Sequence, residues 1–306
     1  MSVYEEAYAS PSRVIGVFRY LLHLKGQRCL RAELEEMMMP DHLPLPLKVQ
    51  SEGEEEEEEK KDAPKRNMVR RTVGEALTME LFAADGEDVL LHPSLAAPSR
   101  SPKTGEALLP RTLTTLLLSA SNTANHDLAR AIAWYLDQDV YDAPTHWSQV
   151  DTKNFSAAVT ALAMTNSRFG QLLHWSRYLG FSWAHATRDY KGVSLVPDPY
   201  RQIRWALTDL FSQHSGSVLL LSTVIPYLSS VLPVLDGGVF RTELEGKLLP
   251  TREPHQLSSA TAHALMRLSD ESVFKLAYRS DGTVYVFPDG VGDVRFTEVA
   301  WQGNTQ

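Results

Sequence analysis

The sequence is poor in the residue patterns on which catalysis and disulfide-stabilised folds depend. Its single cysteine, Cys29, excludes both an intramolecular disulfide framework and a cysteine-based zinc finger. The ten histidines include no HExxH pair, and a glycine-rich phosphate loop, a GxSxG nucleophile elbow and a paired catalytic carboxylate are all missing. We therefore expect a protein that is not an enzyme and that holds no metal or cofactor. An enzyme of unfamiliar type is the alternative.

Long apolar segments are also scarce. Residues 1–10 contain two glutamates and no apolar core, so we expect no secretory signal and a cytoplasmic protein. Residues 218–235 form the one stretch of 18 residues without a charge that is also rich in apolar side chains, and it is long enough for a membrane span. Two prolines, Pro226 and Pro233, would kink or break such a helix. We therefore expect a pair of buried core helices there and no membrane partner.

The composition is otherwise that of a globular protein, with 43% hydrophobic and 22% charged residues among 306. At roughly 150 residues per domain, a chain of this length is expected to form about two domains. The formal net charge of −8 does not favour nucleic acid as a partner, so a basic surface would have to be local.

Half of the acidic surplus lies in one low-complexity segment. Residues 51–66 read SEGEEEEEEKKDAPKR and hold 8 acidic and 4 basic residues, a net charge of −4. Because such a segment repels itself and buries little, we expect a disordered acidic insertion at about 40–65. The alternative is an acidic arm that mimics nucleic acid or binds a basic partner.

Residues 1–100 fit a winged helix that carries this insertion. Ser10 and Pro11 are typical of a helix start, and Gly26 would end that helix. Three helices followed by a turn and a strand are typical of a winged helix-turn-helix, although the insertion lengthens the connection between the second and third helices. The expected elements are helices at about 11–25, 30–38 and 69–83, a turn at Asp85-Gly86 and a strand at 88–91.

Basic residues gather where such a fold would contact DNA. In a winged helix the third helix enters the major groove, and its N-terminal side contacts phosphates. Arginine at that end can neutralise phosphates or bind a guanine edge with two hydrogen bonds. The alternatives are that these residues balance the glutamate tract, or that the winged helix binds protein. The candidate nucleic-acid-binding residues are Arg28, Arg31, Lys65, Arg66, Arg70 and Arg71.

Residues 101–250 are expected to be mainly helical, with a second winged helix at 154–197. Gly180 is a typical C-cap for the last helix of that unit, and strands at 181–187 and 193–196 follow it. Four aromatic residues at this joint are expected to pack, with base stacking as the alternative; they are Trp175, Tyr178, Phe181 and Trp183. The expected helices are at 108–120, 125–138, 154–164 and 166–179, and the next begins at Asp198-Pro199.

Residues 251–306 repeat the pattern of a helix followed by strands. Ser258 or Ser259 is expected to cap a helix that continues to Leu268. Strands are expected at 273–278, 283–287 and 294–299, with Ser280-Asp281-Gly282 as a hairpin turn between the first two. The charges of Arg279 and Asp281 balance in this wing, which favours contact with protein. The predicted fold class is therefore mainly α with small β-hairpins (α+β), as multiple winged helix-turn-helix units around a helical middle.

Two segments, SRVIGVFRYLLHL at 12–24 and FGQLLHWSRYLGFSW at 169–183, resemble DpdG-type winged-helix accessory proteins of phage-defence and DNA-modification systems. The resemblance covers a small part of the chain and carries no catalytic residue. It implies a cytoplasmic, non-enzymatic component of a modification or restriction assembly.

The resulting hypothesis is an adaptor that docks a larger protein assembly of ATPase, helicase or nuclease subunits and contacts double-stranded DNA. Two alternatives stay open. One is a winged-helix transcriptional regulator, which would be a dimer on a palindromic site. The other is a winged-helix subunit of an SMC-type chromosome-condensing complex.

Overall fold

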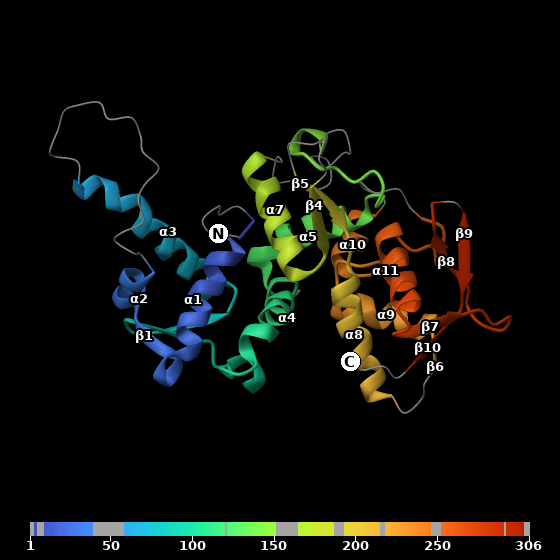
Figure 1. Cartoon of the computed structure of the whole chain (residues 1–306), viewed down its shortest axis with the longest axis horizontal. Helices are drawn as coiled ribbons and strands as arrows, with labels where there is room; N and C mark the ends of the chain where they lie inside the picture. Colours follow the sequence, from blue (N-terminus) through green and yellow to red (C-terminus); the bar gives the residue numbers. More distant parts are fainter. Residues whose placement is uncertain are drawn as a thin grey trace. The chain divides into compact units, whose positions relative to one another are not determined.

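A computed structural model describes residues 3–4, 9–38, 58–119, 121–150, 165–186, 193–214, 218–245, 252–290 and 292–302, without the side chains of 58–67, 185–186 and 193–194. The chain divides into two compact units, unit 1 (Met1–Leu116) and unit 2 (Leu117–Gln306). The described chain is mainly helical with short antiparallel strands, as the predicted α+β class requires (Figure 1). The domain boundaries predicted at residues 100 and 250 stay a prediction.

Unit 1 combines helices with a three-stranded antiparallel sheet. The sheet has the order β1-β3-β2, so the last strand along the chain lies in the middle. The elements are α1 (Pro11–His23), β1 (Arg28–Leu30), α2 (Arg31–Met37), α3 (Glu58–Thr78), β2 (Phe82–Asp85), β3 (Asp88–Leu91) and α4 (Gly105–Leu117).

The first helix forms where its sequence predicts. Ser10 is the N-cap residue and Pro11 the first helical residue. Val14, Phe18 and Leu21 recur at helical spacing and are buried. α1 packs against α3, so this apolar stripe holds the unit together.

The third helix differs from its prediction at both ends. α3 begins at Glu58, inside the segment expected to be disordered, because glutamate, lysine and alanine are strong helix formers despite their low hydropathy. It ends at Thr78, close to Glu80, which has a left-handed φ of 61°. Residues 82–85 are therefore strand β2, paired with β3, and not the end of a helix. Residues 40–57 of the expected insertion lie outside the described residues.

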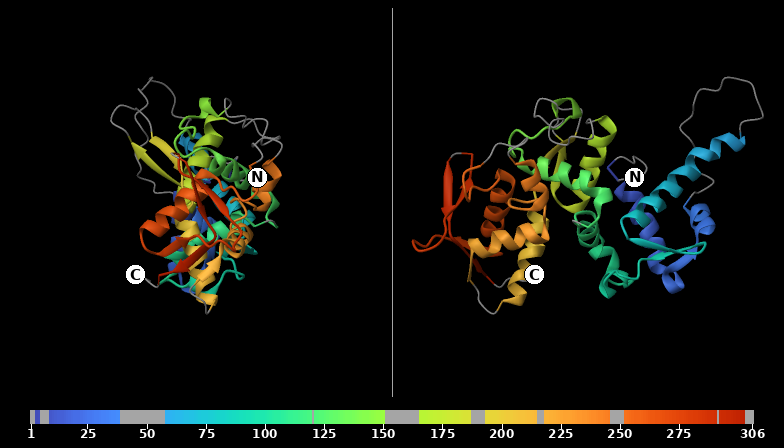
Figure 2. Two further views of the ribbon diagram at one scale, coloured as in Figure 1. Left: turned by 90° about the vertical axis from the view of Figure 1, so that its right-hand side faces the viewer. Right: turned by 180° about the vertical axis from the view of Figure 1, so that it is seen from behind.

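The described residues of unit 2 form a second three-stranded sheet and two separate hairpins. The sheet has the order β6-β10-β7, and the hairpins are β4–β5 and β8–β9 (Figures 1 and 2). The elements are α5 (His126–Asp137), α7 (Asn166–Leu179), β4 (Ser182–Ala186), β5 (Val193–Pro197), α8 (Tyr200–Gln213), β6 (Val218–Leu220), α9 (Leu221–Val231), α10 (Val239–Leu244), α11 (Ser259–Asp270), β7 (Phe274–Ala277), β8 (Tyr285–Pro288), β9 (Asp293–Phe296) and β10 (Glu298–Trp301). The predicted helix at 154–164 lies outside the described residues.

The two sheets are built by the same order of elements. In unit 1 the order is α1-β1-α2-α3-β2-β3. In unit 2 it is α8-β6-α9-α10-α11-β7-β8-β9-β10, which is the same order with α10 and the hairpin β8–β9 inserted. In both sheets the first strand along the chain is at one edge and the last strand is central. The C-terminal sheet therefore takes its first strand, β6, from the segment predicted to be helical middle.

The segment 218–235 is not the predicted pair of core helices. It forms strand β6 and one helix, α9, with Pro226 inside that helix. β6 becomes a strand because Val218, Leu219 and Leu220 pair with β10, and such pairing with distant residues is not visible in a local pattern. None of the helices in the described part of the chain has both the length and the apolarity needed to cross a bilayer.

The predicted hairpin between 273–278 and 283–287 is also wrong. β7 pairs with β10, whereas β8 pairs with β9 and forms a bridge to Gln256 through Val286. The amide of Asp289 donates to the carbonyl of Gly292 in the β8–β9 turn. Both backbone edges of β8 are thus used by partners other than β7.

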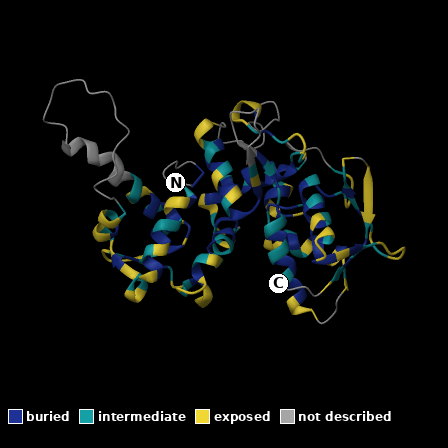
Figure 3. Ribbon diagram, in the orientation of Figure 1, coloured by how far each residue is buried: buried dark blue, intermediate teal, exposed yellow. Residues whose placement is uncertain are grey.

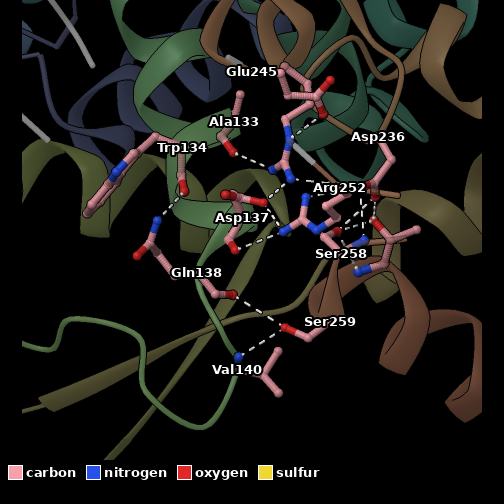
Figure 4. Close-up of polar contacts among 12 residues, drawn as sticks. Ala133, Trp134, Asp137, Gln138, Val140, Asp236, Glu245, Arg252, Ser258 and Ser259 are labelled. Atoms are coloured by element: carbon pink, nitrogen blue, oxygen red, sulfur yellow. Dashed lines mark hydrogen bonds and ion pairs between the residues drawn. The ribbon is translucent and has the colours of Figure 1, made fainter. Parts of the chain in front are cut away.

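A buried ionic cluster links three parts of unit 2 (Figure 4). The Arg241 side chain on α10 is 1% exposed and binds Asp137 at the end of α5, while Arg252 binds the same carboxylate. Arg241 also donates to the carbonyl of Ala133, 3.3 Å away. Next to them, Asp236 accepts a 2.8 Å hydrogen bond from Ser258, the N-cap residue of α11.

Replacing Arg241 tests this cluster. We expect Arg241→Ala to lower the free energy of unfolding by about 3–5 kcal/mol, because it leaves a buried carboxylate short of its main partner. Urea denaturation of full-length protein measures the change. Arg130→Ala is the control, since Arg130 on α5 makes more exposed pairs with Asp127 and Glu243 and should cost about 1 kcal/mol or less. If the two variants lost equal free energy of unfolding, burial would not be what makes the Arg241 ion pair important for stability.

Asp137 should make stability depend on pH. Burial raises the pKa of its carboxyl from 3.8 to about 6 in spite of the opposing effect of Arg241. The folded state therefore holds this proton more tightly than the unfolded chain, and stability falls as the pH rises from about 4 to 6. Relative to Asp137→Asn, the wild type should lose about 3 kcal/mol over this range. Urea denaturation at each pH measures this difference in the free energy of unfolding. If the wild type instead gains stability over Asp137→Asn as the pH rises, the raised pKa of Asp137 is refuted.

Candidate nucleic-acid interface

The structure places the predicted arginines on three elements of unit 1. Arg28 lies in β1 and not at the start of a helix, Arg31 is the first residue of α2, and Arg70 and Arg71 are in α3. The prediction placed Arg70 and Arg71 at the N-terminal end of this helix. Because α3 begins at Glu58, they lie instead in its second half. For Lys65 and Arg66 the structure describes only the backbone, which is helical.

Arg28 is held by two aspartates of the β2–β3 hairpin. Its Nε lies 2.8 Å from Asp88 Oδ2, and its Nη2 lies 3.1 Å from Asp85 Oδ2. The hydrogen bond with Asp88 is the main reason that the pKa of Arg28 is raised. The antiparallel pairing of β1 with β3 brings these charges together.

Arg31 and Arg70 share a single carboxylate. Arg31 Nε lies 3.1 Å from Glu35 Oε1, and Arg70 Nε lies 3.6 Å from the same oxygen. Arg31 also donates to the backbone carbonyl of Arg70, 3.5 Å away, so α2 and α3 are linked here. The Arg70 side chain is still 65% exposed and can reach solvent.

A groove of about 650 Å³ lies beside these residues. It is formed by the start of α2, the second half of α3 and the β2–β3 hairpin. Its charged lining residues are the basic Arg31 and Arg70 and the acidic Glu35, Glu87 and Asp88. Charges of both signs line the groove, so this surface is polar without being uniformly basic.

Sequence reasoning found the arginines and missed their carboxylate partners. Glu35 could have been found, because it follows Arg31 by four residues on one helix face. Asp85 and Asp88 could not, because their contact with Arg28 depends on the unpredicted strand β1. Salt bridges this exposed contribute little to stability. Their effect here is to reduce the positive charge offered to a phosphate.

The other candidate functional residues in the described part of the chain do not form a site. Among the described residues, no group of three or more histidine, cysteine, aspartate or glutamate side chains is placed to hold a metal ion. Cys29 is buried in β1, and burial raises the pKa of its thiol, which makes it less reactive. Trp175 and Phe181 are fully buried, as predicted for packing, whereas Trp183 is 47% exposed.

Comparison with known proteins gives one family. The model of a family described as DpdG-like matches residues 1–282, which covers unit 1 and unit 2 up to the connection between β7 and β8. No curated protein matches the chain, and no solved structure matches it.

Removing the shared carboxylate tests whether the unit 1 arginines contact DNA. We expect Glu35→Gln to tighten binding to a duplex and to steepen the log–log salt dependence by about 0.9 for each arginine that gains a phosphate contact. Fluorescence anisotropy from 50 to 200 mM salt measures both. The control is Glu36→Gln, the same charge change one residue along α2, where no described basic side chain forms an ion pair with the carboxylate. If both variants respond equally, only net charge matters.

Proposed function

The chain belongs to the DpdG-like family, and we propose on this basis that it is a non-enzymatic winged-helix adaptor of a prokaryotic DNA-modification and phage-defence system. The adaptor would work in the cytoplasm, dock larger subunits of ATPase, helicase or nuclease type, and bring them to double-stranded DNA. The family supports the link to a DNA-modification system, and the fold supports the winged-helix part.

The repeated order of elements is the observation that carries the proposal. Helix, strand, helix, helix, strand and strand, with the last strand central, is the order of a winged helix-turn-helix. The α1–β3 segment follows it, and the α8–β10 segment follows it with α10 and the hairpin β8–β9 inserted. In both, extra residues separate the second and third helices, so the turn of the motif is replaced by an insertion.

The C-terminal copy has the features of a protein-docking unit. Its third helix, α11, packs against β8, α8 and α5, so little of it is open to a DNA groove. The extra hairpin β8–β9 lies between β7 and β10 in the chain, at the position of the wing (Figure 2). At the base of this wing Tyr278 is 58% exposed beside Arg279, and tyrosine and arginine are enriched among residues that dominate protein interfaces.

Co-purification tests the adaptor role. Full-length protein is co-expressed with the other proteins of its DNA-modification cluster, and complexes are separated by size-exclusion chromatography. We expect a stable complex, and no turnover of ATP or nucleic acid by the purified chain alone. Tyr278→Ala should weaken the complex about tenfold, an ordinary hot-spot loss. The control is Trp147→Ala, an exposed aromatic outside the C-terminal sheet.

Two results would refute the proposal. One is turnover by the purified chain, which would make it an enzyme. The other is failure to form a complex with any protein of the cluster.

A further inference from the structure

Among the described elements, α3, α7 and α11 each precede a strand, and these helices differ in what their surfaces offer to DNA. α3 exposes Arg70, but Glu35 lies 3.6 Å from it. α11 packs against β8, and its arginine, Arg267, pairs with Asp198 and Glu271 at 3.3 and 3.0 Å. A carboxylate thus accompanies Arg70 in α3 and Arg267 in α11.

The helix α7 is different, because it contains no acidic residue. Its sequence is NSRFGQLLHWSRYL, with one face buried through residues such as Phe169, Leu172 and Trp175. Exposed turns follow one another along the opposite side of the helix (Figure 3). In the part of the chain that the structure describes, no carboxylate oxygen lies within 4.0 Å of the guanidinium of Arg177 or the ring of His174.

The outward positions of α7 form a continuous stripe, which we name the α7 face. Residues at spacings of three, four and three along a helix lie on one side of it. From Ser167 to Arg177 the stripe is about 15 Å long at 1.5 Å per residue, and a helix of that length fits in the roughly 12 Å wide major groove of DNA. The α7 face consists of Asn166, Ser167, Gly170, His174 and Arg177.

The helix is anchored at both ends. Thr165 caps its start by accepting a 3.2 Å hydrogen bond from the Arg168 amide. At its end Gly180 has a φ of 86°, and Arg201 and Gln202 of α8 donate to the carbonyls of Tyr178 and Leu179. These contacts leave the α7 face on a fixed scaffold.

The hairpin that comes after α7 is fixed as well. The hydroxyl of Tyr135 on α5 donates to the carbonyl of Leu195 in β5 at 2.7 Å, and Ser182 of β4 lies 2.9 Å from Ser176 of α7. Since side chains alternate along a strand, Trp183 points away from α7 and does not contribute to its exposed face.

Gly170 allows close approach to the middle of the stripe. Glycine in a helix interior costs stability relative to alanine. A Cβ added at Gly170 would meet nothing within 4 Å, so internal packing does not require glycine there. The missing side chain opens the helix backbone to a ligand.

We propose that the α7 face binds the major groove of double-stranded DNA, with Arg177 on a phosphate and Asn166, Ser167 and His174 at base edges or sugar–phosphate oxygens. Charge complementarity supports this partner, since the stripe has no carboxylate in a chain with a net charge of −8. The inference rests on the proposed function, which places the protein on DNA, and it adds a DNA contact in unit 2 to any that unit 1 makes.

A salt series on full-length protein tests the assignment. Binding to a fluorescein-labelled 25-base-pair duplex is measured by anisotropy between 50 and 200 mM salt. We expect Arg177→Ala to flatten the log–log salt slope by about 0.9, the loss of one phosphate contact. Arg295→Ala is the matched control, because it removes the same charge from an exposed strand of unit 2, and its slope should not change.

The variant Gly170→Leu distinguishes a loss of DNA contact at the α7 face from a loss of folding stability. Because the space around its Cβ is open, this variant should melt no lower than the wild type while binding duplex at least tenfold more weakly. Gly170→Ala should melt slightly higher and bind nearly as the wild type does.

The outcomes distinguish this inference from the proposed function. A slope that responds to Arg70→Ala and not to Arg177→Ala would overturn the inference and leave DNA contact with unit 1. Duplex DNA that is not bound at 50 mM salt, or binding confined to single strands or RNA, would also overturn it. Neither result affects the co-purification test, which alone decides the adaptor role.

Discussion

The arrangement of unit 2 depends on a guanidinium that is removed from water. A buried positive charge is stable only when it is paired and fully hydrogen-bonded. Arg241 meets this demand through Asp137, Glu245 and the carbonyl of Ala133. Its partners come from α5 and α10, and the neighbouring Asp236 binds the N-cap residue of α11. Helices that are distant in the chain therefore keep one geometry, and α7 and α11 are positioned on that frame through α5.

The same order of elements serves different surfaces in this chain. For α11 and α7, the strands that follow the helix decide whether its outer side is accessible. The hairpin β2–β3 brings Asp85 and Asp88 to Arg28, and β8 covers α11. After α7, the hairpin β4–β5 is tied back to α5 through Tyr135 and leaves the outer side of the helix open. An adaptor needs both a surface that binds protein and one that reaches DNA, and such divergence would supply them.

Local signals predicted many elements well. The Ser10-Pro11 start of α1, the Gly180 end of α7 and the Ser258 cap of α11 occur as expected, because capping depends on residues within one turn of the helix end. Strands β1 and β6 were missed, since three residues carry too little periodicity to be recognised. The pairing of β7 with β10 was missed for a related reason, because short strands of similar pattern leave several pairings open until the whole sheet forms.

The candidate site shows the same division. Which residues are basic and which stretches are apolar was readable in the sequence, and so was the helical character of α7 with its lack of acidic residues. Charge compensation was not readable, because Arg28 meets Asp88 only across a sheet and Arg70 meets Glu35 only where two helices pack. The sequence by itself therefore determined many of the helices, several of their caps and the family resemblance. The tertiary structure alone decided which arginines are neutralised and which helix face stays open, because ion pairing and burial depend on distances between residues far apart in the chain.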